Sequence, residues 1–135
     1  MSDNEHIEFI ASQIVDSAIK IHKYLGPGLL EKVYETCLEH ELKKRGLTVQ
    51  RQLIIPIEYD SLCLEEGFRL DLLVENKVIV ELKAIEETLP IHEAQLLTYM
   101  KVLKKPQGLL INFFSKNITK SMKPFVNEYF NMLPD

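Results

Sequence analysis

The sequence has no tryptophan, only two cysteines, and no repeat or low-complexity tract among its 135 residues. Cys37 and Cys63 do not form a CxxC pair, so a zinc or redox role is disfavoured and both thiols are expected to be reduced. No apolar run approaches the roughly 20 residues that a membrane-spanning helix needs. The acidic N-terminus also lacks a signal-peptide core. We therefore expect a cytoplasmic protein with no membrane partner.

Basic charge is also scarce in this chain. The 16 Lys and Arg residues are outnumbered by 20 Asp and Glu residues, which gives a net charge of −4. This balance argues against a protein that coats DNA, although it is compatible with an enzyme that has a local basic site. Hydrophobic residues make up 46% of the chain, as in globular proteins. The length and the lack of a linker predict a single domain over residues 1–135.

Helical periodicity marks three segments of the chain. Apolar residues recur at helical spacing from His6 to Leu25, and Gly26-Pro27-Gly28 is expected to end that helix. A second helix is predicted from about Leu30 to Arg45 and a third from about Ile91 to Lys104. The residues expected to face the core are Val33, Tyr34, Cys37, Leu38 and Leu42 in the second helix, and Ala94, Leu97 and Met100 in the third.

Segments rich in Val, Ile and Tyr predict strands between and after these helices. Residues 47–60 are expected to form a strand with an edge or bulge at Pro56, and residues 67–84 a hairpin. Residues 107–114 predict a fourth strand, and the tail from residue 119 to 133 a short strand, a helix or both. The order αα-βββ-α-β indicates an α/β or α+β protein with a mixed sheet.

The predicted hairpin contains two carboxylates and an ammonium within the most apolar segment of the chain. Strand side chains alternate between faces, so Asp71, Glu81 and Lys83 are expected on one face. That face also holds Arg69, Leu73 and Ile79, and the opposite face holds Leu70, Leu72, Val80 and Leu82. A turn at residues 75–77 places Asp71 across from Glu81, whereas a turn at residues 74–76 places Arg69 there. The sequence does not choose between these two registers.

Two interpretations of the charged face follow from the residues alone. Composition favours a solvated face with a cross-strand pair between Arg69 and Glu81. The other interpretation is a divalent metal site, because neighbouring carboxylates repel each other unless a proton or cation lies between them. Hard oxygen ligands suit Mg²⁺ or Mn²⁺. Lys83 could then orient an attacking water or neutralise charge on a phosphate.

Motifs in and around the hairpin resemble those of a known family. Asp71, followed ten residues later by Glu81-x-Lys83, resembles the Asp…Glu-x-Lys signature of the PD-(D/E)XK nuclease superfamily. The stretch "GLLEKVY" at residues 28–34 matches the G-x-x-E-x-x-Y motif that names the GxxExxY family, which is assigned to this superfamily.

Further downstream, Gln95-x-x-x-Tyr99 is similar to the Q-x-x-x-Y motif of the RecB-like nucleases. The stretch "GLLINF" at residues 108–113 resembles the later strand of that family. The resemblance covers residues 10–124, in the order that the family has.

The resemblance implies a fold class and an activity. The fold would be α/β, a restriction-endonuclease-like core with a mixed central β-sheet flanked by helices. The activity would be a metal-dependent nuclease that hydrolyses phosphodiester bonds in DNA, or alternatively RNA, by in-line attack of metal-activated water. Mg²⁺ or Mn²⁺ would be held by Asp71, Glu81, Glu31 and the Leu82 carbonyl, and Lys83 would orient water or stabilise the transition state. Glu35 competes with Glu31 for its place in the cluster.

The resemblance also implies supporting residues. Gln95 and Tyr99 lie at i and i+4 on one helical face and would position the metal–water network or the phosphate backbone. His22 is a further candidate, because related nucleases carry a helical histidine near the metal. Lysines that could contact phosphate, or could be ordinary surface residues, are Lys101, Lys104, Lys105, Lys116, Lys120 and Lys123.

Two alternatives to a nuclease remain open at this point. One is a catalytically inactive nucleic-acid- or protein-binding module on the same fold, which the small size favours and the intact Asp71, Glu81 and Lys83 disfavour. The other is a structural interaction protein that uses the charged face for assembly. A homodimer would give a small nuclease added grip on its substrate, although no residue demands it.

Overall fold

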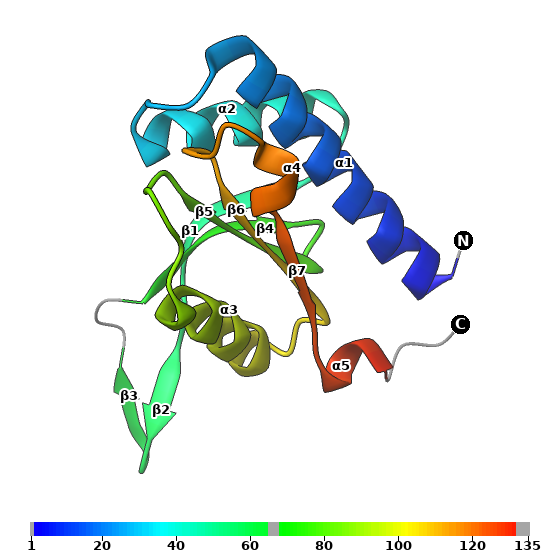
Figure 1. The fold of residues 1–135 in the computed structure, drawn as a ribbon. Coiled ribbons are helices and arrows are strands. Elements are labelled where there is room, and N and C mark those ends of the chain that lie inside the picture. Colours follow the sequence, from blue (N-terminus) through cyan, green and yellow to red (C-terminus); the bar gives the residue numbers. More distant parts are fainter. Residues whose placement is uncertain (1, 65–67, 132–135) are drawn as a thin grey trace.

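The structure is a computed structural model that describes residues 2–64 and 68–131. Figure 1 shows helices on both sides of a twisted central sheet. The helices are α1 (Asp3–Leu25), α2 (Glu31–Lys44), α3 (Pro90–Leu103), α4 (Ile118–Ser121) and α5 (Glu128–Asn131). The strands are β1 (Val49–Ile54), β2 (Ile57–Tyr59), β3 (Leu62–Leu64), β4 (Arg69–Val74), β5 (Val78–Lys83), β6 (Gln107–Asn112) and β7 (Lys123–Val126).

The central sheet has five strands in the order β1-β4-β5-β6-β7. Neighbouring strands run antiparallel, except that β5 and β6 are parallel. A parallel pair needs a crossover connection, and α3 provides it between β5 and β6. The predicted mixed sheet flanked by helices is therefore confirmed.

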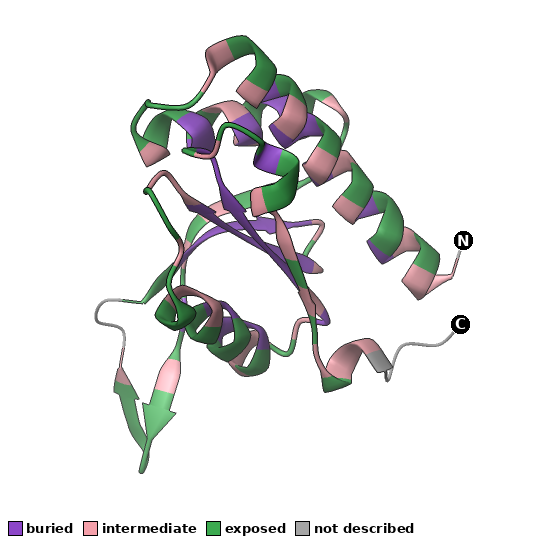
Figure 2. Cartoon of the chain, viewed as in Figure 1, coloured by how far each residue is buried: buried purple, intermediate pink, exposed green. Residues whose placement is uncertain are grey.

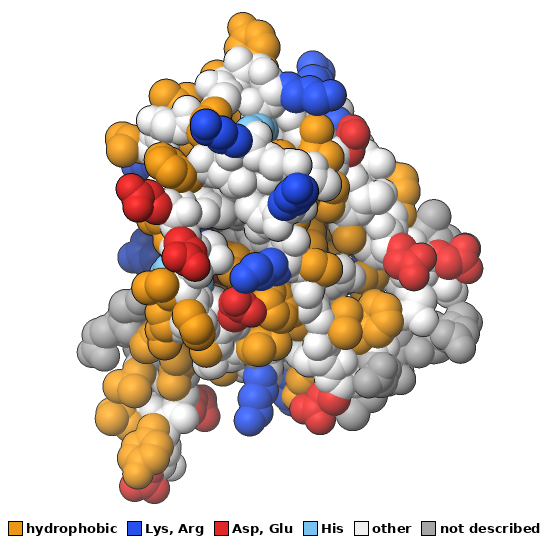
Figure 3. All heavy atoms as spheres, viewed as in Figure 1, with side chains coloured by type: hydrophobic (Ala, Val, Ile, Leu, Met, Phe, Trp, Pro, Cys, Tyr) orange, Lys and Arg blue, Asp and Glu red, His pale blue; other side chains and the backbone are white. Residues whose placement is uncertain are grey.

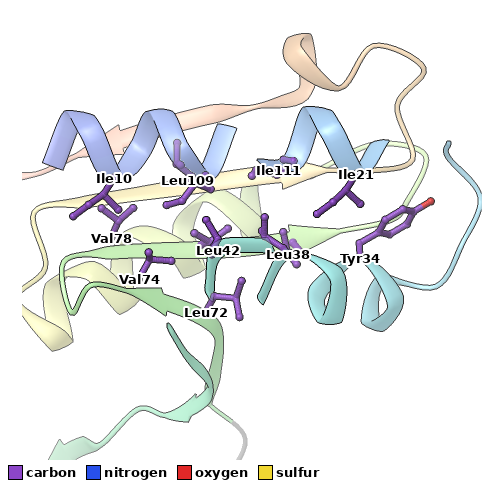
Figure 4. Close-up of a cluster of buried hydrophobic side chains, with 14 of the residues drawn as sticks. Ile10, Ile21, Tyr34, Leu38, Leu42, Leu72, Val74, Val78, Leu109 and Ile111 are labelled. Carbon is purple, nitrogen blue, oxygen red and sulfur yellow. The ribbon is translucent and has the colours of Figure 1, made fainter. Parts of the chain in front are cut away.

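The two faces of the sheet carry separate cores. Against α1 and α2 lies the larger one, which includes Ile10, Leu38, Leu72, Val78 and Ile111 (Figure 4). Against α3 lies a smaller one, which includes Leu73, Ile79, Leu96, Tyr99 and Leu110. Strands β4, β5 and β6 are consequently almost entirely buried (Figure 2). The carboxylates of Asp71 and Glu81 on these strands are thus placed where water is largely excluded.

The predicted helix and strand positions are largely confirmed, and the corrections concern which face a residue occupies. Val33, Ala94 and Leu97 are exposed instead of facing the core. In α3 the buried residues are Leu96, Tyr99 and Met100. Leu70 packs in the α3 core instead of sharing a face with Leu72. Short apolar runs do not fix a helix face, because several helical phases place two or three apolar residues inward.

A second, two-stranded sheet was not predicted. Residues 47–60 do not form one strand, because the chain leaves the central sheet at Pro56 and pairs β2 with β3. This β2–β3 hairpin projects away from the rest of the domain (Figure 1). The tail forms both of the predicted kinds of structure, namely β7 and the short helices α4 and α5. Within the described residues, no helix is long and apolar enough to cross a membrane.

Candidate active site

The β4–β5 hairpin adopts the register that brings the two acidic residues together. Leu72 pairs with Val80 and Val74 with Val78, so the turn spans residues 75–77 and Asp71 lies opposite Glu81. Glu75 and Asn76 have φ values of 53° and 54°, in the left-handed region that such a turn uses. The alternative register, with Arg69 opposite Glu81, is wrong, because it would pair Leu72 with Val78, whereas Leu72 pairs with Val80.

At the end of the hairpin away from the turn, the carboxylates of Asp71 and Glu81 accept hydrogen bonds from backbone amides of the two strands. The Asp71 amide donates to Glu81 Oε1 at 3.0 Å, and the Leu82 amide donates to Asp71 Oδ2 at 2.8 Å. The Asp71 and Glu81 residues are only 9% and 8% exposed. The interpretation of this face as solvated is therefore wrong for the two carboxylates, which are buried side by side.

Burial raises the pKa of both carboxyl groups. The pKa of Asp71 is raised to about 6, first by burial and then by the charge of Glu35, despite hydrogen bonds from Leu82 and Gln52 that favour the ionised form. The pKa of Glu81 is raised to about 8, first by burial and then by the charge of Asp71. Two carboxylates whose charges oppose each other this strongly can bind a proton or a cation.

The start of α2 is fixed by the chain turn before it. Gly26 and Gly28 have φ values of 71° and 104°, where a side chain would be strained. The buried Tyr34 hydroxyl donates to the Gly26 carbonyl at 2.6 Å and accepts from the Leu29 amide at 3.1 Å. Its ring stacks on Phe113, with centroids 4.5 Å apart. In the G-x-x-E-x-x-Y motif, the glycine and the tyrosine thus hold the turn that sets Glu31 as the first residue of α2.

Glu31 and Glu35 differ in whether their charge is already neutralised. Glu35 is buried and paired with Arg51, whose Nη2 and Nε lie 3.0 and 3.1 Å from Glu35 Oε2. Glu31 has no hydrogen-bond partner within residues 2–64 and 68–131, and its pKa is raised by burial and then by the charge of Asp71. Glu31 is therefore the free carboxylate beside Asp71, whereas Glu35 is engaged by the protein itself.

The Arg51–Glu35 pair supplies a prediction about stability. Replacing Arg51 with alanine leaves the Glu35 carboxylate buried without its cation, so we expect a loss of about 3 kcal/mol in the free energy of unfolding. Urea unfolding followed by circular dichroism measures it. Arg69→Ala is the matched control, because Arg69 is exposed, and its effect should stay below about 0.5 kcal/mol. Equal effects of the two substitutions would contradict the assigned pairing.

Lys83 ends β5 and lies among these acidic groups. Its charge lowers the pKa values of Glu31, Asp71 and Glu81, and also that of His92. Tyr99 approaches from α3, since burial and then the charges of Glu81 and Asp71 raise the pKa of its hydroxyl. The structure therefore brings Glu31, Asp71, Glu81, Lys83 and Tyr99 together from four different elements.

Other residues singled out in the sequence lie differently. Gln95 is exposed on α3, one turn before Tyr99, with no hydrogen bond to a site carboxylate among the described residues. His22 Nε2 lies 2.7 Å from the Ser115 carbonyl, so it holds the loop after β6 against α1. The Leu82 amide bonds to Asp71, while its side chain packs in the larger core.

The lysines do not gather at one place. Lys105 donates to Asn76 at the β4–β5 turn, which is the opposite end of β5 from Lys83, and Lys104 ends α3 nearby. Lys120 and Lys123 instead line a polar pocket of about 240 Å³ with Asn112, the register partner of Lys83. Lys123 is paired there with Glu93 at 3.1 Å. A larger groove of about 920 Å³ lies between α1 and α2 and includes none of the site carboxylates.

The carboxylates of the site are suited in kind to a divalent cation. The free carboxylate is that of Glu31, and it lies beside the buried Asp71 and Glu81, whose charges repel each other. Carboxylate oxygens are hard ligands of the kind that Mg²⁺ and Mn²⁺ bind. Within the described residues, no three His, Cys, Asp or Glu side chains are arranged as a complete ligand set. The chemical type of these ligands therefore fits such a cation. In this structure the Asp71 and Glu81 carboxylates accept hydrogen bonds from backbone amides of the opposite strand.

The strand residues Arg51 and Gln52 also contact this site, and sequence reasoning missed both. Gln52 Nε2 donates to Glu35 and, at 3.3 Å, to Asp71 Oδ1. Strand alternation places consecutive residues on opposite faces, so no pattern in the sequence indicates that both would reach one glutamate.

Comparison with protein families identifies one match. The family model described as the PD-(D/E)XK nuclease superfamily matches residues 8–125, which is most of the chain. The arrangement of the mixed sheet and its helices is consistent with the restriction-endonuclease-like fold. Comparison with curated proteins and with solved structures gave no significant match.

Proposed function

The chain belongs to the PD-(D/E)XK nuclease superfamily, and on that basis we propose that it is a metal-dependent nuclease that hydrolyses phosphodiester bonds in DNA, with RNA as the other substrate to test. Superfamily membership indicates a nucleic-acid substrate and the use of divalent metal ions. Mg²⁺ or Mn²⁺ as the ion and DNA as the substrate are parts of the proposal. The proposal also includes membership of the GxxExxY family, supported by Gly28, Glu31 and Tyr34, and a RecB-like assignment, supported by Gln95 and Tyr99. A cytoplasmic location is a further part of the proposal.

One observation carries the proposal. Asp71 and Glu81 are buried opposite each other with raised pKa values, and a lysine follows on the same strand. Such a pair is costly to fold, and burying a charge costs several kcal/mol unless it is compensated. An arrangement with this cost is expected at a functional site, where a cation supplies the missing charge.

Each residue has a distinct role in the proposed site. Asp71, Glu81 and Glu31 would hold the cation, and the Leu82 carbonyl would add a further oxygen. A bound divalent cation supplies Lewis-acid charge at a phosphate oxygen and a lower pKa for water. The Lys83 ammonium would orient the attacking water or stabilise the negative charge that develops on the phosphate. Tyr99 would orient these groups through its hydroxyl. Gln95 and His22 stay candidates for supporting roles: Gln95 is exposed one turn before Tyr99, and His22 contacts the Ser115 carbonyl.

Two lysines near this end of the sheet are candidates for contacting a polyanionic substrate, although Lys123 is already paired with Glu93. Lys120 and Lys123 line the pocket next to Asn112, and Asn112 is the register partner of Lys83. Electrostatic attraction is local, so a net charge of −4 does not exclude it. The same pocket also contains Glu86 and Glu87, which would repel phosphate in the absence of a cation.

The experiment is a cleavage assay with labelled single- and double-stranded DNA and RNA, with and without Mn²⁺ or Mg²⁺. We expect cleavage that depends on the ion and that Asp71→Asn abolishes. The second candidate is a catalytically inactive binding module on the same fold. Nucleic-acid binding that needs no metal and survives Lys83→Ala, together with no cleavage, would favour that module over the nuclease.

We also propose that the chain pairs with a second copy through the β2–β3 hairpin. Tyr59 and Leu62 on this hairpin are 73% and 58% exposed, and Figure 3 shows hydrophobic side chains gathered over it. Residues 52–68 include acidic residues and no Lys or Arg, which disfavours nucleic acid as the occupant. The α1–α2 groove is lined by apolar residues together with Lys23, Asp16 and a Lys20–Glu41 pair. In a two-fold pair each apolar hairpin could fill the groove of the other copy.

Light scattering on a sizing column tests this pairing. We expect a dimer for the wild-type chain and a monomer for Leu62→Asp, because a buried unpaired carboxylate in the interface is costly. Phe9→Asp is the matched control, since Phe9 is also an exposed apolar residue but lies on α1 outside the groove. It should leave the dimer intact. A monomeric wild-type chain at the highest concentration at which it stays soluble would rule the pairing out.

A further inference from the structure

Gln52 has an unusual backbone conformation for a residue inside a strand. Its φ is 54°, in the left-handed region, which is uncommon for residues other than glycine. The register of β1 against β4 is unbroken around it, since Arg51 pairs with Leu72 and Leu53 with Leu70. Gln52 therefore occupies the position opposite Asp71 in the register. Its strained backbone changes the direction of the side chain and does not shift the strand.

This conformation lets two consecutive side chains reach the same glutamate. In an extended strand Arg51 and Gln52 would point to opposite faces. Here the Arg51 guanidinium contacts Glu35 Oε2, and Gln52 Nε2 donates to Glu35 Oε1. Both oxygens of Glu35 are thus engaged by neighbouring residues of β1, which fixes the orientation of that buried carboxylate.

The Gln52 amide also connects Glu35 to Asp71. Its Nε2 lies 3.3 Å from Asp71 Oδ1, so the two hydrogens of one amide group serve two carboxylates. Asp71 Oδ2 accepts from the Leu82 amide. Each oxygen of Asp71 therefore has one protein donor, and each keeps one lone-pair direction for a further partner.

We propose that Gln52 is a positioning residue, which holds the Asp71 carboxylate in the orientation that a divalent cation requires. The inference rests on the proposed nuclease function and adds to it a strand residue outside the motifs. A neutral donor between Glu35 and Asp71 fixes their separation without competing for the cation as a charged residue would. Partners that orient a ligand in this way usually change metal affinity about 10- to 100-fold when removed.

Gln52→Gly tests the role without the risk that strain destroys the fold. Glycine accepts a φ of 54° without strain and removes the amide, whereas Gln52→Asn keeps an amide on a residue that also tolerates this conformation. Gln50→Gly is the matched control, because Gln50 is exposed on the same strand, as Gln52 is, and has no side-chain hydrogen bond to a carboxylate within the described residues. Circular dichroism and urea unfolding establish that each variant is folded.

The measurements are Mn²⁺ binding by calorimetry and exchange of side-chain amide protons by NMR in the metal-free protein. We expect Mn²⁺ affinity to fall about 10- to 100-fold in Gln52→Gly, to recover in part in Gln52→Asn, and to stay unchanged in Gln50→Gly. The Gln52 amide protons should exchange more slowly than those of Gln50. Wild-type binding that Gln52→Gly leaves unchanged would overturn the role of Gln52 alone, whereas a wild-type chain without Mn²⁺ affinity would overturn the nuclease proposal.

Discussion

Replacing Lys83 with alanine is expected to lower the rate of phosphodiester cleavage about 10²- to 10³-fold while the protein stays folded and still binds Mn²⁺. A group that stabilises developing charge contributes about this much to a rate. Lys83 is only half-buried at the end of β5, so its removal leaves no large cavity. The rate is measured at saturating Mn²⁺ with the labelled substrate that the wild-type enzyme cleaves best.

The Lys83 variant should also shift metal binding toward higher pH. The Lys83 charge lowers the pKa values of Glu31, Asp71 and Glu81, so without it these groups hold their protons more strongly. Because Mn²⁺ binds the ionised form, its apparent affinity should then rise at higher pH than in the wild type. Lys44→Ala, an exposed lysine at the end of α2, is the control and should change neither quantity. A Lys83→Ala enzyme with the wild-type rate would remove this lysine from the mechanism.

Replacing Glu81 with glutamine is expected to abolish Mn²⁺ binding and to stabilise the metal-free protein above about pH 8. The ordinary pKa of Glu81 is 4.5, and burial, followed by the charge of Asp71, raises it to about 8 in the folded state. The folded state therefore binds more protons than the unfolded state between these values. The contribution of Glu81 to the free energy of unfolding is therefore highest at low pH, falls as pH rises from about 4.5 to 8, and is constant beyond that.

Glutamine removes that fall in stability, because it keeps the shape of Glu81 and has no charge to bury. We expect a gain of about 2 kcal/mol at pH 8.5, or roughly 6 °C in Tm, measured by thermal unfolding without metal. Glu41→Gln is a control of opposite sign. Hydrogen bonds from Lys20, with a smaller contribution from Arg45, lower the pKa of Glu41, so it stabilises the fold at neutral pH and its removal should destabilise. A Glu81→Gln variant that is less stable than the wild type at pH 8.5 would contradict the assigned burial.

Part of the site could be predicted from the sequence because it depends on short-range patterns. The alternation of β4 and β5 placed Asp71, Glu81 and Lys83 together, and the spacing of apolar residues located α1, α2 and α3. The G-x-x-E-x-x-Y motif placed Glu31 near the start of a helix. Its link to the hairpin came from the family resemblance, since residues 40 positions apart carry no local signal of contact.

The rest depended on three-dimensional contacts. The register of the hairpin depends on the left-handed conformations of Glu75 and Asn76, which the sequence "ENK" does not specify. Composition favoured a solvated charged face, and burial by α2 and α3 reversed that. Gln52 reaches the site through a backbone angle that only the packed strand determines. The projecting β2–β3 hairpin was missed because Pro56 was compatible with a bulge in one long strand.

A crystal structure of the chain soaked in Mn²⁺, with anomalous diffraction recorded near the manganese edge, tests the central claim most directly. We expect an anomalous peak within about 2.0–2.6 Å of carboxylate oxygens of Asp71 and Glu81, as hard cations bind oxygen, with Glu31 turned toward it. Glu81 would have exchanged its bond to the Asp71 amide for the cation. A saturating soak that leaves this position without a peak, and leaves Glu81 on the Asp71 amide, would contradict the claim that this is a metal-dependent active site.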